Sequence, residues 1–469
     1  MIRNTKLALA IGMAIASSHA LAVNTEFDNF TPLGASAGPT ANEATPITLS
    51  SPNFSQRSIA DRTTQLAAGQ FNSGAWDMNT VNQGGPDAGR YLYTVFETGQ
   101  SGIQRLDLTT NAARTIWQSP AAAPALNSHV AFDASYWTPW DTFITAEESW
   151  GGQPQPYGRL FEVTNPLKPT GTVDVVHRNA IARVSHEGIQ FDSQGHMYFI
   201  DELNGGSLYR YTSAAGLGDD YFDGGVNAVL RVGNGLTPNA TGAATWIDFT
   251  DNTGAGLAGA VTVIDPNFVE SVDGRATTNV AAFKGTDYQR PEDLQIGRTA
   301  TGDELLYMAT TTTHEIYAFN ITTSTMSLFA NQSTIDIGTG VAVGSQLLNP
   351  DNVAIDSAGN IYIIEDRNGG VDDDIWFAKD SNHDGDLLDA GEGLARWASN
   401  GTPGSEFTGL YFDPFNPNRA WVNIQHPSSG VDRTIELTAS PVPVPASVWM
   451  LGSALIGMGS LKRRNKKKA

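Results

Sequence analysis

The sequence of 469 residues contains no cysteine, so disulfide bonds and thiolate metal ligands are both excluded. Basic residues are also scarce, because 28 Lys and Arg stand against 49 Asp and Glu, a net charge of −21. A nucleic-acid partner would need Lys and Arg to neutralise its phosphates, and this balance argues against one. The acidic excess favours an exported protein that binds divalent cations.

Two familiar catalytic signatures are missing as well, the His-Glu-x-x-His zinc motif and the phosphate-binding Gly-Lys-Ser/Thr loop. Ser185, His186 and Glu187 are adjacent in sequence and therefore cannot form a catalytic triad among themselves. Helical periodicity is nearly absent, which indicates an all-β chain.

A repeated pattern of short apolar strands and Gly/Asn/Asp turns runs along most of the chain. Its first strands read AWDM, VAFD, IQFD, LQIG, VAID and LYFD, and their starts are separated by 55, 59, 105, 59 and 57 residues. The long step predicts one repeat with an insertion, roughly residues 216–283, expected to run over one face as a long loop. The pattern predicts a six-bladed β-propeller with one long insertion, covering residues 23–440.

Both ends of the sequence look like processing signals. Residues 1–22 combine Arg3 and Lys6, an apolar run and Ala20-Leu21-Ala22, as in a secretory signal peptide. Removing both ends leaves 20 basic against 49 acidic residues, since no acid lies in either end. The expected destination is the periplasm, the cell surface or the extracellular matrix of a Gram-negative bacterium, reached by the secretory route.

Residues 441–469 contain a Pro-Val stretch, an apolar run and a basic end. This layout resembles the PEP-CTERM sorting tail that exosortase enzymes recognise, although Val444 replaces the usual Glu. The resemblance implies an exosortase-type processing partner and membrane contact only through the tail before processing. A permanent single-span anchor is the alternative.

In a propeller, the residues before each inner strand and those ending each second strand meet at one face of the channel. Here they are Asn127, Ser128, His129, Ser185, His186, Glu187, Arg290, Glu292, Asp293, Asp351, Asn352, Glu406, Glu97, Glu147, Glu148, Asp201, Glu202, Glu365, Asp366, Gln425 and His426. So many carboxylates cannot all ionise without cations, and hard oxygen ligands suit calcium. Any single acid could instead make ordinary turn hydrogen bonds.

Several strings in this chain resemble the PhoX-type alkaline phosphatases. They are WDTFITAEES, RVSHEGIQFD with MYFIDE and LYRY, RPEDLQI, NPDNVAIDSAGNIYIIED, and EFTG followed by WVNIQHP. They follow the family's order from about residue 70 to 435. The resemblance implies a six-bladed propeller with a calcium and iron centre that hydrolyses small phosphate monoesters.

Carried onto this chain, the resemblance assigns roles to a small set of side chains. Glu187 and Glu292 are the foremost metal ligands and, with Arg290, the catalytic residues. Arg290 would bind the substrate phosphate through its planar fork, together with His186 and His426. The further metal candidates are Glu147, Glu148, Asp201, Asp351 and Asp366.

One departure from the family concerns iron. The family places a cysteine thiolate on iron in the segment that here reads Thr-Ala-Glu-Glu, where the matching residue is Ala146. A methyl group cannot bind a metal, so this departure argues against Fe³⁺ or another transition metal at that position. It also leaves open a non-catalytic, calcium-binding propeller at the cell surface or in an exopolysaccharide matrix.

A second calcium site is predicted at Asp380, Asn382, Asp384 and Asp386, where oxygens alternate and Gly385 takes the sixth position. A solvated acidic turn is the alternative. Four tryptophans could line the mouth of a pocket, although packing between blades is the favoured role for most of them: Trp76, Trp137, Trp140 and Trp150.

Overall fold

The computed structural model describes residues 24–151, 154–367 and 373–441. The predicted signal peptide and nearly all of the predicted sorting tail therefore lie outside the described residues. Helix is confined to α1 (Arg62–Ala67), α2 (Gly274–Thr278) and the 3-10 turns η1 (Ala281–Phe283) and η2 (Gly344–Gln346) of this part of the chain. None of these helices has the length and apolarity needed to cross a membrane.

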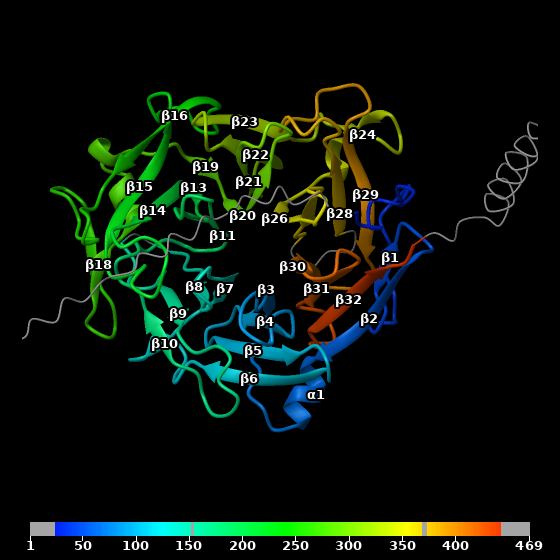
Figure 1. Cartoon of the computed structure of the whole chain (residues 1–469), viewed down its shortest axis with the longest axis horizontal. Coiled ribbons are helices and arrows are strands. Elements are labelled where there is room, and N and C mark those ends of the chain that lie inside the picture. Colours follow the sequence, from blue (N-terminus) through cyan, green and yellow to red (C-terminus); the bar gives the residue numbers. More distant parts are fainter. Residues whose placement is uncertain (1–23, 152–153, 368–372, 442–469) are drawn as a thin grey trace, which may run out of the picture.

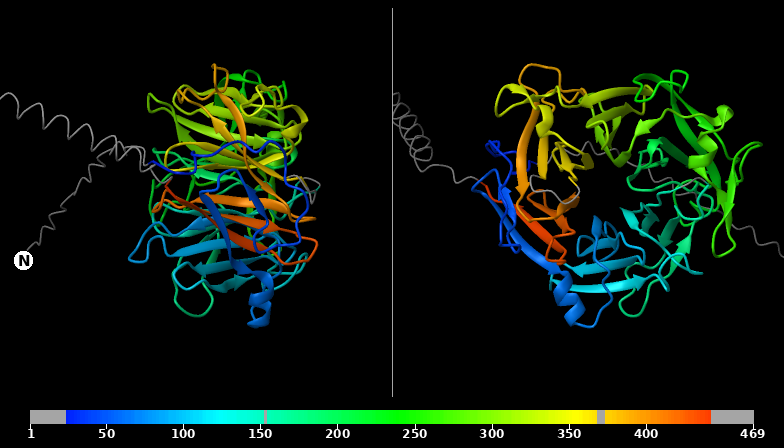
Figure 2. Two further views of the ribbon diagram at one scale, coloured as in Figure 1. Left: turned by 90° about the vertical axis from the view of Figure 1, so that its right-hand side faces the viewer. Right: turned by 180° about the vertical axis from the view of Figure 1, so that it is seen from behind.

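The predicted all-β architecture is confirmed, and the sheets are arranged around a common centre (Figures 1 and 2). The first sheet contains β3 (Trp76–Val81), β4 (Tyr91–Phe96), β5 (Gly102–Asp107) and β6 (Ala112–Gln118), and the second contains β7 (Phe132–Trp137), β8 (Phe143–Glu147), β9 (Leu160–Val163) and β10 (Val175–His177). Both are antiparallel meanders, in which each strand pairs with the next along the chain.

The middle of the chain forms one nine-stranded sheet. Its strands, in sheet order, are β11 (Ile189–Phe191), β12 (Met197–Ile200), β14 (Leu208–Ser213), β15 (Gly225–Val232), β16 (Gly242–Asp248), β23 (Thr325–Ala330), β22 (Glu315–Asn320), β21 (Glu304–Thr310) and β20 (Pro291–Arg298). Because β16 pairs with β23, the third and fourth repeats share this sheet, and the count of six blades stays a prediction.

Two further sheets complete the circle. One contains β25 (Val341–Ala342), β24 (Ile335–Asp336), β29 (Gly393–Asn400), β28 (Asp374–Lys379), β27 (Ile361–Glu365), β26 (Pro350–Ile355) and β1 (Ile47–Leu49), and the other contains β2 (Phe54–Asp61), β32 (Arg433–Ala439), β31 (Arg419–Gln425) and β30 (Glu406–Phe412). Small pairs are formed by β13 (Asn204–Gly206) with β19 (Tyr288–Gln289) and by β17 (Thr262–Ile264) with β18 (Glu270–Val272).

The first strands of the repeats form the inner ring. In the described chain β3, β7, β11, β20, β26 and β30 contact one another in that order, and β30 returns to β3. The ring is closed by β2 near the start of the described chain, which pairs along its length with β32 near its end. A sheet with neighbours on both faces buries both sets of side chains, which explains continuous apolar strands such as IYIIE in β27.

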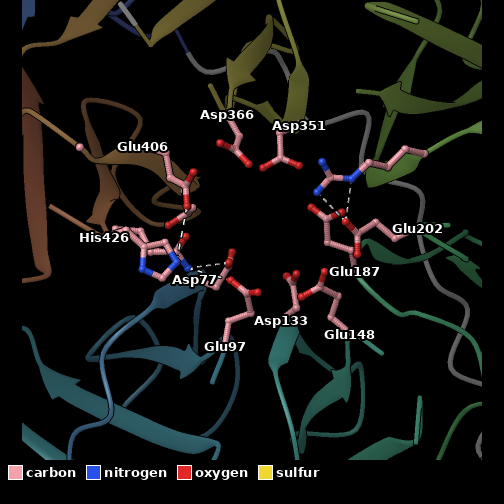
Figure 3. A pocket seen from close by; sticks show the side chains of 14 residues that line it. Asp77, Glu97, Asp133, Glu148, Glu187, Glu202, Asp351, Asp366, Glu406 and His426 are labelled. Atoms are coloured by element: carbon pink, nitrogen blue, oxygen red, sulfur yellow. Dashed lines mark hydrogen bonds and ion pairs between the residues drawn. The ribbon is translucent and has the colours of Figure 1, made fainter. Parts of the chain in front are cut away.

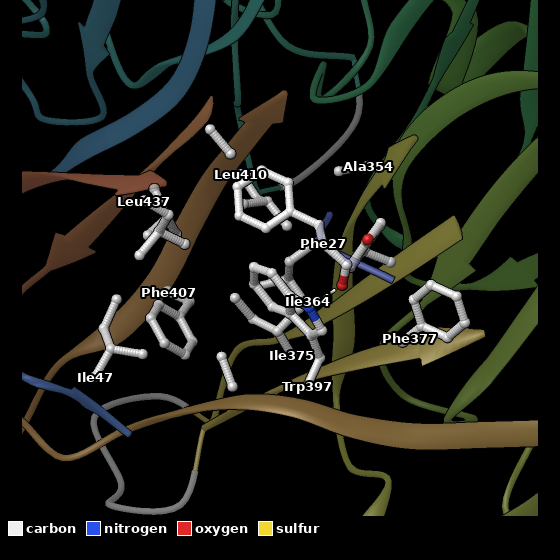
Figure 4. Packing of buried hydrophobic residues seen from close by; sticks show 14 of the residues in the cluster. Phe27, Ile47, Ala354, Ile364, Ile375, Phe377, Trp397, Phe407, Leu410 and Leu437 are labelled. Carbon is white, nitrogen blue, oxygen red and sulfur yellow. Dashed lines mark hydrogen bonds between the residues drawn. The ribbon is translucent and has the colours of Figure 1, made fainter. Parts of the chain in front are cut away.

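Aromatic side chains fill the space between neighbouring sheets. Phe27 packs edge-on against Phe54 and Trp397 at 5.5 and 5.6 Å, and its carbonyl accepts the Trp397 indole N–H at 3.0 Å (Figure 4). The N-terminal segment therefore supports the closing sheet, in addition to the strand β2 that it supplies.

The predicted insertion behaves differently from expectation. We expected residues 216–283 to run over one face as a long loop, but β15 and β16 from this segment extend the sheet of β14. The remainder supplies the β17–β18 hairpin and α2. The high Gly, Ala and Asn content of the whole segment concealed these strands, although β15 itself contains three valines, which favour β-structure.

Candidate metal centre

A local irregularity at the start of the inner strands directs acids into the channel. The register shifts within the first residues of β3, β7, β20, β26 and β30. A bulge of this kind re-aims the side chain beside it. The second residue of four of these strands is acidic: Asp77, Asp133, Glu292 and Asp351. Glu187 precedes β11 by two residues, and Gly409 takes the corresponding place in β30.

A repeated backbone contact places a second set of acids nearby. The N–H groups of Glu97, Glu148, Glu202 and Asp366, each just after a second strand, donate to the carbonyls of Ala75, Ala131, Ser185 and Asn349 at 2.8–3.0 Å. Thr311 makes the same contact to Arg290 at 3.0 Å. Four of these acceptor residues, Ala75, Ala131, Arg290 and Asn349, have left-handed φ values of 48, 37, 60 and 46°. Such a turn brings the end of one strand beside the start of another.

Together the two sets surround a cavity of about 410 Å³ (Figure 3). It is lined by nine carboxylates, from Asp77, Glu97, Asp133, Glu148, Glu187, Glu202, Asp351, Asp366 and Glu406, together with Arg290, His426, Gln425, Thr408 and Gly404. Arg290 is the one basic side chain that is permanently charged among these lining residues. The cavity is therefore strongly anionic and suited to cations.

Three of the acids meet closely enough to share one ion. One carboxylate oxygen each of Glu187, Glu202 and Glu292 lie within 4.8 Å of one another, and all three residues are buried. Oε2 of Glu187 and Oε2 of Glu292 accept no hydrogen bond from any described residue, and the two carboxyls are close enough to share a proton. Buried carboxylate oxygens without donors are costly unless a cation binds them, so this donor set fits a metal ion.

Burial and mutual repulsion raise the pKa values of most of these acids, whereas the burial of Glu148 is outweighed by hydrogen bonds, which lower its pKa. Burial, followed by the charges of Asp351 and Glu292, raises the pKa of Glu187 well above its usual value. Burial, followed by Asp366, raises the pKa of Glu406 to about 12. Burial raises the pKa of Asp77 to about 7, although hydrogen bonds oppose the shift. Without cations several of these groups would hold protons at neutral pH.

Arg290 bridges two members of the acidic triad. Its Nε lies 3.0 Å from Glu202 Oε1 and 3.0 Å from Glu292 Oε1, and its terminal nitrogen lies 2.8 Å from Glu202. Burial lowers the pKa of Arg290, but the charges of Glu292 and Glu202 outweigh it and keep the guanidinium protonated. The left-handed backbone of this non-glycine residue costs about 1–2 kcal/mol, a strain typical of functional positions.

The predicted site residues fall into two groups, those that line the cavity and those that do not. Glu148, Glu187, Asp351, Asp366, Arg290 and His426 line the cavity, and Glu292 lies against it. His426 lies at the rim, 3.8 Å from Glu406, with its side chain 52% exposed.

Three other predicted residues do not line the cavity, and their roles as metal or substrate ligands stay predictions. Glu147 is fully buried, and its carboxylate binds the guanidinium of Arg159 and the backbone N–H groups of Gly158 and Arg159. Asp201 accepts the N–H of Ser185 at 3.0 Å and does not line the cavity. His186 is fully buried against Phe199, and burial lowers its pKa to about 3. Their sequence neighbours Glu148, Glu202 and Glu187, which lie just outside the strands, line the cavity instead.

The sequence analysis did not single out two of the acids that line the cavity. Asp77 and Asp133 fall inside the strands AWDM and VAFD, where simple alternation gives no indication of a channel position. The usable signal was positional, because aligned repeats place Asp77, Asp133, Glu187, Glu292 and Asp351 at one equivalent site.

Ala146 does not line the cavity. It is fully buried in an apolar cluster with Ala134, Ile144 and Leu160. This strand therefore provides no thiolate to the cavity. Among the lining side chains, the polar atoms are oxygens except for the nitrogens of Arg290, His426 and Gln425.

The second predicted calcium loop uses its oxygens within the loop. Asp380 accepts the N–H groups of Asp384 and Gly385, and Asn382 donates to Asp384 and Asp389. Asp386 accepts the N–H of Leu388. The groups of metal-binding side chains identified in the described residues do not include this loop. Calcium at this position stays a prediction.

A Gly-x-Ser-x-Gly string at residues 34–38 does not form a nucleophile. It lies in irregular structure, and Ser36 Oγ donates to Asp374 Oδ2 at 2.7 Å. A nucleophilic serine in that motif would need a sharp strand-to-helix turn and a histidine partner.

Comparisons with known proteins identify the family and the fold. The family model described as Alkaline phosphatase PhoX matches residues 134–428. Among solved structures, Pseudomonas fluorescens PhoX in complex with vanadate, a transition state analogue, is similar with a TM-score of 0.59 and 16% identity, over 87% of this chain and 98% of that chain. No curated protein sequence matches.

Two other solved structures resemble the chain less. A gluconolactonase from Xanthomonas campestris has a TM-score of 0.42 at 11% identity, over 88% of this chain and 97% of that chain. The calcium-binding protein regucalcin from Agrobacterium tumefaciens has a TM-score of 0.41 at 11% identity, over 83% and 97%. The match to the PhoX structure shows the propeller-like fold, and the family match spans more than half of the sequence, so the chain belongs to the PhoX alkaline phosphatase family.

Proposed function

We propose that this protein is an exported, metal-dependent phosphoesterase that hydrolyses small phosphate monoesters on a six-bladed propeller. The observation that carries the proposal is the buried triad of Glu187, Glu202 and Glu292 beside Arg290. Membership of the PhoX family supports phosphatase chemistry, and the anionic cavity supports dependence on cations.

Each part of the site has a distinct role in this proposal. Glu187, Glu202 and Glu292 would hold the metal, with Asp351 and the other lining acids available for further ions. A bound cation would act as a Lewis acid on the phosphoryl oxygens. Arg290 would leave its carboxylate partners to bind the phosphate through its planar fork and to offset charge on the equatorial oxygens. His426 would contact the substrate from the rim.

Calcium is the metal that this chain fits best. Its ligands are six to eight oxygen atoms in a flexible arrangement, and carboxylates are its preferred donors. With Ala146 in place of a cysteine, the chain offers no thiolate ligand for iron. A second calcium ion at Asp380–Asp386 is a separate proposal.

The termini complete the proposal. The first 22 residues would direct secretion, and residues 441–469 would be processed by an exosortase-type enzyme, which leaves residues 23–440 outside the cytoplasm. Substrate esters would then be met in the periplasm, at the cell surface or in the extracellular matrix.

The test is turnover of a chromogenic phosphomonoester by the purified protein, with calcium and then with a chelator. We expect Glu187→Gln and Glu292→Gln to abolish turnover and to release bound metal, because each removes a charge from the triad. Arg290→Lys should lower kcat/KM by about 10²–10³-fold, since a point charge cannot replace two fixed donors. The exposed Asp219→Asn is the matched control and should change neither quantity.

Tightly bound calcium without turnover of any ester would overturn the enzymatic proposal. That outcome would support the non-catalytic calcium-binding propeller, which the family match does not favour.

A further inference from the structure

Trp150 is held against three residues of the cavity wall. Its indole N–H donates to Glu148 Oε1 and to Glu202 Oε2, the latter at 3.0 Å. The guanidinium carbon of Arg290 lies over the ring, 5.0 Å from its centroid. The side-chain amide of Gln155 donates a 2.9 Å hydrogen bond to the Trp150 carbonyl.

These contacts fix the orientation of the ring without covering it. One edge of the indole is tied to two carboxylates and one face to a cation, yet 43% of the residue remains exposed. A ring fixed in advance loses little conformational entropy when a ligand stacks on it. Trp150 therefore offers a flat apolar surface directly beside Arg290.

The cavity itself has no surface of that kind. Among the described residues that line it there is no aliphatic, phenyl or indole side chain. A leaving group bound wholly inside would face charged and polar side chains. An apolar, planar leaving group can gain contact area on the indole at the wall.

We propose that Trp150 stacks on the base of nucleoside 5′-monophosphates and makes them the preferred substrate class. This inference rests on the phosphatase function proposed above. The guanidinium carbon of Arg290 lies 5.0 Å from the ring centroid, so a base stacked on the exposed part of the indole would lie close to a phosphate bound by Arg290. The ribose of a nucleotide supplies length between phosphate and base, and a ring bonded directly to the ester oxygen has less reach.

The reaction is an ordinary hydrolysis. A water oxygen forms the new bond to phosphorus, and the bond between phosphorus and the 5′-oxygen breaks. The nucleoside leaves as its alcohol with one proton of the water, and the other proton stays with the phosphate or passes to solvent.

The test compares two esters that differ only in the base. We expect kcat/KM for adenosine 5′-monophosphate to exceed that for ribose 5-phosphate by about tenfold, mainly through KM, because stacking holds ground state and transition state alike. Trp150→Leu should bring the ratio close to one. Trp150→Phe keeps a ring but loses the indole N–H, so it should slow both esters while retaining most of the ratio.

The ratio separates stacking from a merely structural role, since a misplaced Arg290 would slow both esters equally. Phe415→Leu is the control, because Phe415 is another exposed aromatic residue, 52% accessible, and does not line this cavity. It should leave the ratio unchanged.

Three outcomes would refute parts of this reasoning in distinguishable ways. A ratio that survives Trp150→Leu would overturn the inference and leave the phosphatase proposal intact. An equal loss for phenyl phosphate and adenosine 5′-monophosphate in Trp150→Leu would overturn the assignment to nucleosides. Failure of the wild-type protein to hydrolyse any of the three esters would refute the phosphatase proposal itself.

Discussion

Removal of bound cations is expected to make the stability of this protein fall as pH rises from 5 to 7. Asp77 provides the magnitude. Burial raises its pKa from 3.8 to about 7, with the charges of Glu148 and Asp366 adding to the shift against two hydrogen bonds. A carboxyl whose folded-state pKa is raised binds more protons in the folded than in the unfolded protein. Its contribution is complete below about pH 3.8 and is lost as pH rises through about 7.

Integrated between pH 5 and 7, this one group lowers the free energy of unfolding by about 2 kcal/mol. The pKa values of Asp133, Glu187 and Asp351 are also raised, so their effects have the same sign. Bound calcium should remove most of this dependence, because a cation stabilises the ionised carboxylates without the need for protons.

The assay is denaturant unfolding at pH 5, 6 and 7, with calcium and with a chelator. Asp77→Asn should reduce the loss of stability in chelator by about 2 kcal/mol, because its amide does not titrate. Asp219→Asn, at an exposed position, should leave the loss unchanged. A chelated protein whose stability is constant or increases over this range would refute the idea that buried acids are crowded at the channel.

Two further substitutions test the placement of individual residues. Glu147→Gln should lower the free energy of unfolding by about 3–5 kcal/mol, since Arg159 would remain buried without its anionic partner, and elemental analysis should show unchanged metal content in the folded protein. A loss of metal would instead place Glu147 among the ligands. Gly409→Ala should destabilise the protein more than Gly302→Ala, as measured by denaturation midpoints. Both glycines have left-handed φ values, but only at Gly409 would a Cβ approach backbone atoms of Asp77 and Asn79 at 2.8 Å. Equal losses would contradict this close approach.

The strands and the general position of the acids could be predicted from the sequence because they depend on local patterns. Alternating apolar residues bounded by Gly, Asn and Asp identify a strand wherever they occur. Acids at strand ends, such as Glu148 and Glu187, were therefore expected near the channel, and both line it.

Which of two adjacent acids faces the cavity could not be predicted in the same way. Glu147 and Glu148 are chemically identical, and only the direction of β8 decides that the first meets Arg159 and the second meets the cavity. The register shift beside Asp77 and Asp133, which both line the cavity, is likewise a property of paired strands and is not visible in one strand alone. The strand β16 was missed because its pairing with the distant strand β23 cannot be read from local sequence, and β15 was missed although its valines favour a strand.

The residues with left-handed φ values just before the inner strands determine how a substrate would be oriented in the cavity. The scaffold offers nearly the same place several times, and it is filled by Ala75, Ala131, Asn349 and Arg290. If cations filled an anionic cavity with rotational pseudo-symmetry, a phosphate bound to them would have no preferred orientation. Arg290 is the one long cationic side chain at these positions. It breaks the symmetry, so that a bound phosphate would be oriented towards one side of the cavity.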